Sequence, residues 1–135
     1  MTRMPAALLA VLLASSLLAR PAAADTGATV VLPDTSALPP AEARALLTQL
    51  AQVNVITSNC PAYALGDADW TLLTGTGDQL AAQLGLDASA YDRQVYAPAF
   101  RLLDDPGACD RVGPTAAGLI GRLRAMGGAA EGAGR

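Results

Sequence analysis

A chain of 135 residues has room for a single domain, and this one contains neither histidine nor lysine. Without the signal segment described next, it carries seven arginines against twelve acidic residues, a net charge of about −5. Nucleic acids and anionic lipid surfaces are bound by concentrated positive charge, so the composition excludes both as expected partners.

Residues 1–24 have the pattern of a secretory signal peptide. A short start containing Arg3 precedes an apolar run over 6–19, and the small residues 22–24 follow. These are the basic, apolar and small-residue regions of an export signal. The run is shorter than the roughly 20 residues that span a bilayer, which disfavours a retained anchor. We therefore expect cleavage after Ala24 and a periplasmic or secreted protein without stable membrane insertion.

Residues 25–39 are predicted to form an extended lead-in to the folded domain. Within them, residues 29–32 suit a short strand or a packed arm. Prolines at 33, 39 and 40 exclude a helix there, because proline has no N–H and its ring clashes with the preceding turn.

Two helices are predicted next. The first begins near Pro40, shows apolar residues at helical spacing, and ends before Pro61. The second begins with Asp67 as its N-cap and ends near Gly85. The glycines at 75 and 77 either permit a close helix crossing or divide this second segment into two.

Two further helices complete the predicted helical domain, which spans residues 40–127. The third is capped by Asp87, and Pro98 inside it is expected to kink or divide it. A strong turn over 104–107 ends it, and the fourth helix is predicted to open at Gly113. Residues 128–135 are expected to form a flexible tail.

The two cysteines predict a single disulfide. Cys60 and Cys109 form an even pair in a small exported domain, where the compartment is oxidising. A metal pair lacks further ligands, and redox-active pairs are usually much closer in sequence. Cys60 lies between the first two predicted helices and Cys109 between the last two. In an up-down-up-down bundle these two links lie at the same end, where the two cysteines can approach closely enough to form a bridge. We therefore predict an all-α four-helix bundle, with orthogonal packing as the alternative.

The acidic residues are the candidate ligands for a hard cation. The five that we expect near the disulfide end are Asp67, Asp69, Asp104, Asp105 and Asp110. The calcium-loop pattern that starts at Asp67 fails at positions 71 and 72. Roles at helix starts and in turns explain these acidic residues instead. The segment 74–78 resembles a phosphate loop only in its glycines, since it lacks the lysine of that motif. We therefore predict no metal, cofactor or catalytic residue.

The aromatic residues are the candidates for a partner surface. Trp70, Tyr91, Tyr96 and Phe100 are expected on neighbouring helices, mainly as core residues. Any of them that is exposed would mark a binding surface, because tryptophan and tyrosine dominate interface energetics.

These observations predict a non-enzymatic exported protein that binds another envelope protein or assists an envelope assembly. Histidine and lysine, the usual general bases and nucleophile activators, are absent. The alternatives are a carrier of a small ligand or metal ion and an acid-stress chaperone. In size, export, helical class and cysteine spacing the chain resembles the periplasmic acid-stress chaperones of the HdeA type. It departs from them in having a full helix before Cys60 and no lysine.

Overall fold

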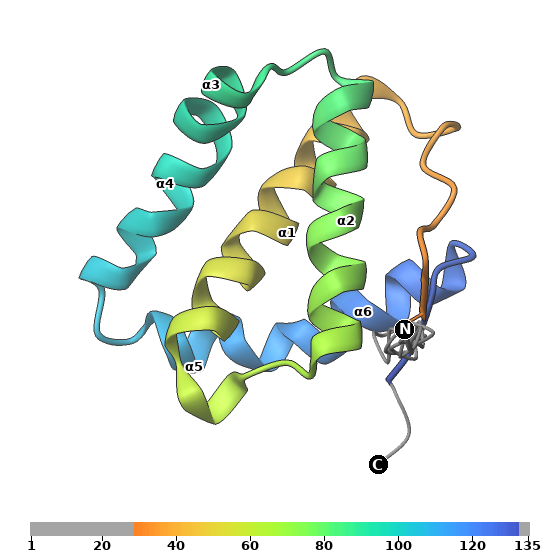
Figure 1. Ribbon diagram of the computed structural model, residues 1–135. Coiled ribbons are helices and arrows are strands. Elements are labelled where there is room, and N and C mark those ends of the chain that lie inside the picture. Colours follow the sequence, from red (N-terminus) through yellow and green to blue (C-terminus); the bar gives the residue numbers. More distant parts are fainter. Residues whose placement is uncertain (1–28, 133–135) are drawn as a thin grey trace, which may run out of the picture.

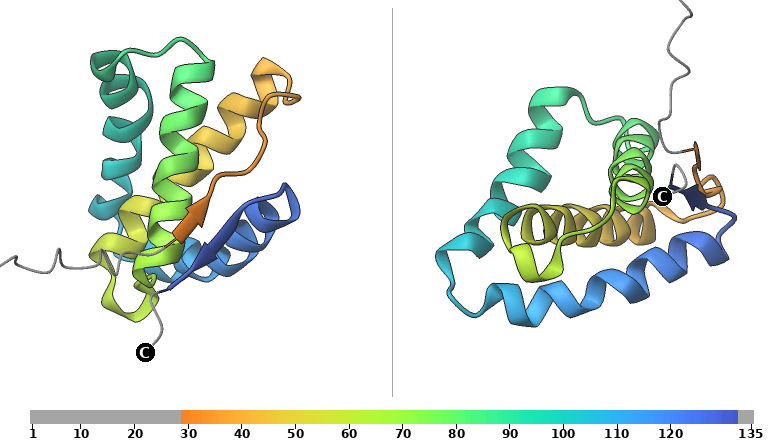
Figure 2. Two further views of the ribbon diagram at one scale, coloured as in Figure 1. Left: turned by 45° about the vertical axis from the view of Figure 1, so that its right-hand side comes forward. Right: turned by 60° about the horizontal axis from the view of Figure 1, so that its bottom comes forward.

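The computed structural model describes residues 29–132, and the predicted signal segment lies outside them. Within this range the chain is mostly helical and forms four helical segments, as the sequence predicted, together with a small two-stranded sheet. The first three segments run in alternating directions, and the last is steeply inclined to the second, α2 (Asp67–Gln83; Figures 1 and 2).

Helix α1 (Pro40–Asn59) is the centre of the fold. Its buried side chains include Leu46, Leu47 and Leu50. It packs against α2 and against the later helices α4 (Ala97–Phe100), α5 (Ala108–Val112) and α6 (Ala116–Ala125). The helix ends at Cys60, whose extended backbone precedes Pro61. A proline disfavours helical geometry in the residue before it, which is why the predicted end is confirmed.

Helix α2 (Asp67–Gln83) is a single unbroken helix through both glycines. A Cβ atom on Gly77 would lie 2.8 Å from the Tyr91 hydroxyl oxygen, and one on Gly75 would lie 2.9 Å from a Leu32 methyl. The division into two helices is therefore wrong, and the glycines leave room for side chains of the lead-in and of α3 (Ala88–Tyr91). The predicted cap was wrong by one residue, because Gly66 occupies the N-cap and Asp67 is the first helical residue.

The third segment changes pitch along its length. It consists of α3 (Ala88–Tyr91), a π-helical turn (Asp92–Tyr96), α4 (Ala97–Phe100) and a 3-10 turn (Arg101–Asp104). Asp87 caps it as predicted, since its Oδ1 accepts the Ala90 N–H at 2.7 Å. Pro98 lacks an N–H for the helical ladder, and the widened π turn ends two residues before it, at Tyr96.

The fourth segment begins earlier than predicted. Helix α5 (Ala108–Val112) contains Cys109, which the sequence placed in a loop, and a 3-10 turn, η4 (Gly113–Thr115), joins it to α6 (Ala116–Ala125). The turn predicted over residues 104–107 explains why the fourth helical segment begins early. The Asp105 carboxylate accepts the Gly107 N–H and its carbonyl accepts the Ala108 N–H, so the turn leads directly into a helix.

The two ends of the described chain meet in a small sheet (Figure 2). Strand β1 (Thr29–Val31) pairs antiparallel with β2 (Ala129–Glu131), with Val30 opposite Ala130. The strand in the lead-in is thus confirmed, whereas the flexible tail was wrong for residues 129–131. Gly127, with φ of +95°, turns the chain back after α6 and makes this pairing possible.

The lead-in after β1 is fixed to α2 by a buried threonine. Thr35 donates its hydroxyl to Gln83 Oε1 at 2.8 Å and accepts from Gln79 Nε2 at 2.7 Å. Gln83 also donates to the Thr35 carbonyl at 3.0 Å. This extended segment is therefore part of the folded domain.

Candidate functional site

The predicted disulfide joins Cys60 to Cys109, with their Cα atoms 5.9 Å apart. It ties the end of α1 to α5 in a small apolar cluster with Ile56 and Ala108. Cys60 is only 4% exposed, so one sulfur is shielded from solvent reagents. The bond is positioned as a structural staple.

The four aromatic candidates divide into two pairs by burial. Trp70 is 46% exposed and Phe100 is 52% exposed, whereas Tyr91 and Tyr96 are half-buried against the main core. Burial raises the pKa of Tyr91, which keeps its hydroxyl protonated. The two tyrosines therefore pack against the core, as expected, whereas Trp70 and Phe100 are exposed.

A polar residue of α1 connects these aromatics across three helical segments. Asn54 accepts the Trp70 indole N–H at 3.1 Å and donates to the Tyr96 hydroxyl at 2.9 Å. The Tyr96 ring lies 5.1 Å from Tyr91 and 6.3 Å from Phe100, centroid to centroid. We call these five residues the aromatic band. No signal in the sequence marks Asn54, because its role depends on which helices flank α1.

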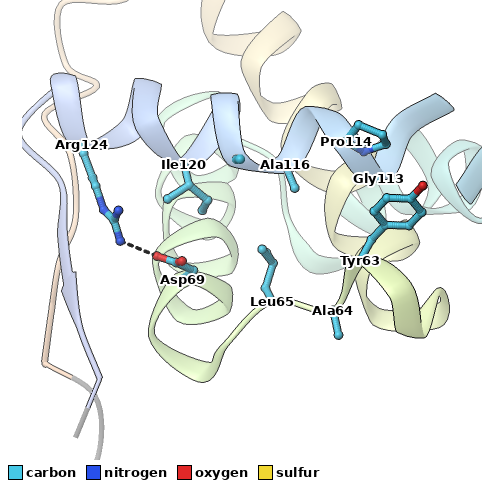
Figure 3. A pocket seen from close by; sticks show the side chains of 10 residues that line it. Tyr63, Ala64, Leu65, Asp69, Gly113, Pro114, Ala116, Ile120 and Arg124 are labelled. Atoms are coloured by element: carbon cyan, nitrogen blue, oxygen red, sulfur yellow. Dashed lines mark hydrogen bonds and ion pairs between the residues drawn. The ribbon is translucent and has the colours of Figure 1, made fainter. Parts of the chain in front are cut away.

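A second candidate site is a groove between α6 and the link that joins α1 to α2. Its volume is about 390 Å³, within the range of pockets that hold small molecules. On one side lie η4 and α6, and on the other lie residues 63–65 and Asp69 (Figure 3). The apolar side chains that line it are those of Tyr63, Ala64, Leu65, Pro114, Ala116, Ala117 and Ile120.

Polar side chains lie toward each end of this groove. Arg124 Nη2 donates to Asp69 Oδ1 at 2.7 Å, as Figure 3 shows. Beside the other end, the Tyr63 hydroxyl donates to Asp110 Oδ1 at 2.8 Å. This hydrogen bond raises the pKa of Tyr63, because ionisation would remove the proton that the phenol donates to the Asp110 carboxylate. The groove thus has apolar side chains between its ends and an Asp69–Arg124 ion pair at one end.

The acidic candidates do not form a common cluster. Asp69 pairs with Arg124, Asp105 with Arg111, and Asp110 with Tyr63. The Arg111 guanidinium and the Gly107 N–H hold the pKa of Asp105 below its ordinary value. Within residues 29–132, no three cysteine, aspartate or glutamate side chains gather closely enough to hold a metal ion.

Comparison with protein-family models, curated proteins and solved structures found no match. In the described part of the chain, none of the helices combines the length and apolar character needed to span a bilayer. The geometry of the aromatic band and the groove is therefore the basis for assigning a function.

Proposed function

We propose that this chain is an exported, non-enzymatic helical protein that binds another protein of the cell envelope through its aromatic band. The observation that carries the proposal is the exposure of Trp70 at 46% while its indole N–H is held by Asn54. An aromatic side chain that is exposed but already positioned loses little conformational entropy when a partner covers it.

The neighbouring residues support this function. Phe100, 52% exposed, continues the band through Tyr96, so apolar surface from α2 and α4 belongs to one connected set. The hydroxyl of Tyr96 and the amide of Asn54 supply hydrogen-bonding groups between the two exposed rings. Large apolar anchors with polar groups among them are typical of protein interfaces.

Export is part of the proposal and rests on the leader pattern together with the disulfide. Disulfides persist in the periplasm and outside the cell, whereas the cytosol keeps thiols reduced. Intact-mass measurement of the protein recovered from the envelope fraction tests this step. The expected species begins at Asp25 and is lighter than its reduced form by two hydrogen atoms. An uncut leader with free thiols would contradict export.

Replacement of the two exposed rings tests the binding role. We expect Trp70→Ala and Phe100→Ala each to weaken capture of the envelope partner by tenfold or more, because truncated hot-spot residues commonly cost at least 1.4 kcal/mol. The matched control is Val31→Ala, which shortens an exposed apolar side chain on β1, remote in sequence from the band. The measurement is affinity purification with quantitative mass spectrometry, followed by titration of the captured protein. Equal capture by all three variants would exclude the band as the interface.

A further inference from the structure

We propose that the groove between α6 and residues 63–69 binds a small carboxylic acid with an apolar body, whose carboxylate contacts Arg124. This inference goes beyond the proposed function, because the groove and the aromatic band share no residue. If the groove does not bind a carboxylic acid, the proposal for the aromatic band is unaffected, and the reverse also holds.

The body of the groove suits an apolar molecule. Ile120 and Ala116 are each only 4% exposed, so they form an apolar base. The Tyr63 and Leu65 side chains lie on the opposite side, and the Pro114 ring lies near the Tyr63 end (Figure 3). Apolar surface on two sides of a small volume favours an aliphatic or aromatic chain over a fully polar ligand.

The charged end selects the head group. Arg124 is the single cationic residue that lines the described groove, and its side chain is 49% exposed. Its hydrogen bond to Asp69 uses Nη2, while a guanidinium carries five N–H donors in a planar fork. A second carboxylate can therefore bind the remaining donors, with the bidentate geometry that arginine favours.

A cationic head group fits this end less well. Asp69 lies in the first turn of α2, where the helix dipole favours its negative charge, and it already accepts from Arg124. Arg124 lies in the last turn of α6 and is the more exposed partner of the pair. Of the two charged side chains at this end, the cation is therefore the one more open to a ligand.

Calorimetric titration of the full exported protein, with its disulfide intact, tests the proposal. The probes are decanoate, decanol and decylamine, each kept below its aggregation concentration. We expect decanoate to bind, decanol to bind at least tenfold more weakly, and decylamine to bind most weakly, since charge-assisted hydrogen bonds differ from neutral ones by this order. Binding of decylamine in preference to decanoate, or no binding of decanoate, would overturn the proposal.

Four variants place the site and define its charge. Arg124→Gln should reduce decanoate affinity tenfold or more and leave decanol unchanged, whereas Arg122→Gln, exposed on α6 and outside the groove, should change neither. Asp69→Asn removes the competing carboxylate and should strengthen decanoate binding. Ala117→Phe, at an exposed lining position, should block both probes without unfolding the protein. Equal decanoate binding by Arg124→Gln and Arg122→Gln would overturn the proposal, as would an unchanged affinity of Ala117→Phe.

Discussion

Single polar residues join segments that are far apart in the sequence. Asn54 links α2 to the π-helical turn through hydrogen bonds to Trp70 and Tyr96. Thr35 joins the lead-in to α2 through two glutamines. Nothing in the sequence distinguishes these side chains. Their importance depends on burial, because a buried polar group needs a hydrogen-bond partner.

The Asp105–Arg111 pair makes a small contribution to stability that depends on pH. The lowered pKa of Asp105 means that its carboxylate is stabilised in the folded state. This stabilisation is present above the unfolded pKa of about 3.9 and is lost as the pH falls through the lower folded value. In Asp105→Asn, the loss of unfolding free energy should therefore be larger at pH 7 than at pH 2.5.

Urea unfolding at low salt measures this difference. Both partners are about half exposed, with side-chain values of 58% for Arg111 and 47% for Asp105, so the effect should shrink at high salt. Asp104→Asn, the adjacent exposed acid, is the matched control. An equal loss at both pH values would contradict a role of the Asp105 charge. It would also remove one contribution to the acid opening that the chaperone alternative requires.

At the scale of elements, α5 and α6 lie beside the link after α1 because the Gly113 backbone closely contacts the Tyr63 ring. A Cβ atom on Gly113 would lie 2.3 Å from Tyr63 Cγ, at the base of that ring, so the ring would have to move. Gly118, in α6, has no such neighbour within 4 Å. Glycine therefore serves packing at one position and is replaceable at the other.

Alanine substitution at these two positions should have opposite effects. We expect Gly113→Ala to lower the free energy of unfolding by about 1–3 kcal/mol through overpacking. Gly118→Ala should raise it by about 0.5–1 kcal/mol, because alanine is the better helix former. Chemical denaturation of both variants measures the changes. Stabilisation by Gly113→Ala would show that the contact with Tyr63 is not restrictive.

At the scale of the whole molecule, the disulfide closes the larger part of the helical domain into one loop. Cys60 and Cys109 are 49 residues apart in sequence, and the bond joins α1 to the last helical segment. In the chain-entropy model a loop of about 50 residues stabilises the folded state by about 4 kcal/mol. This is a large fraction of the 5–15 kcal/mol that is usual for a domain.

Removal of both sulfurs should cost approximately this amount. We expect Cys60→Ala combined with Cys109→Ala to lower the free energy of unfolding by about 4 kcal/mol, measured by urea denaturation. The wild-type protein in reductant is the matched comparison and should lose a similar amount, while the double variant should not respond to reductant. A loss below about 1 kcal/mol would show that the unfolded chain is already restricted.

The sequence by itself determined the helical class, most element ends and the pairing of the cysteines. Apolar periodicity, prolines and capping acids act within one or two turns, so features such as the Asp87 cap can be inferred locally. The candidate aromatics were also identified, although not which of them are exposed.

The tertiary structure alone decided the partners of these local elements. Strand β2 exists because residues 129–131 meet β1 from the other end of the described chain. The groove exists because α6 passes beside residues 63–69, and the aromatic band exists because Asn54 lies between two flanking helices. Packing between segments that are distant in sequence sets these contacts, and local propensity carries no information about it.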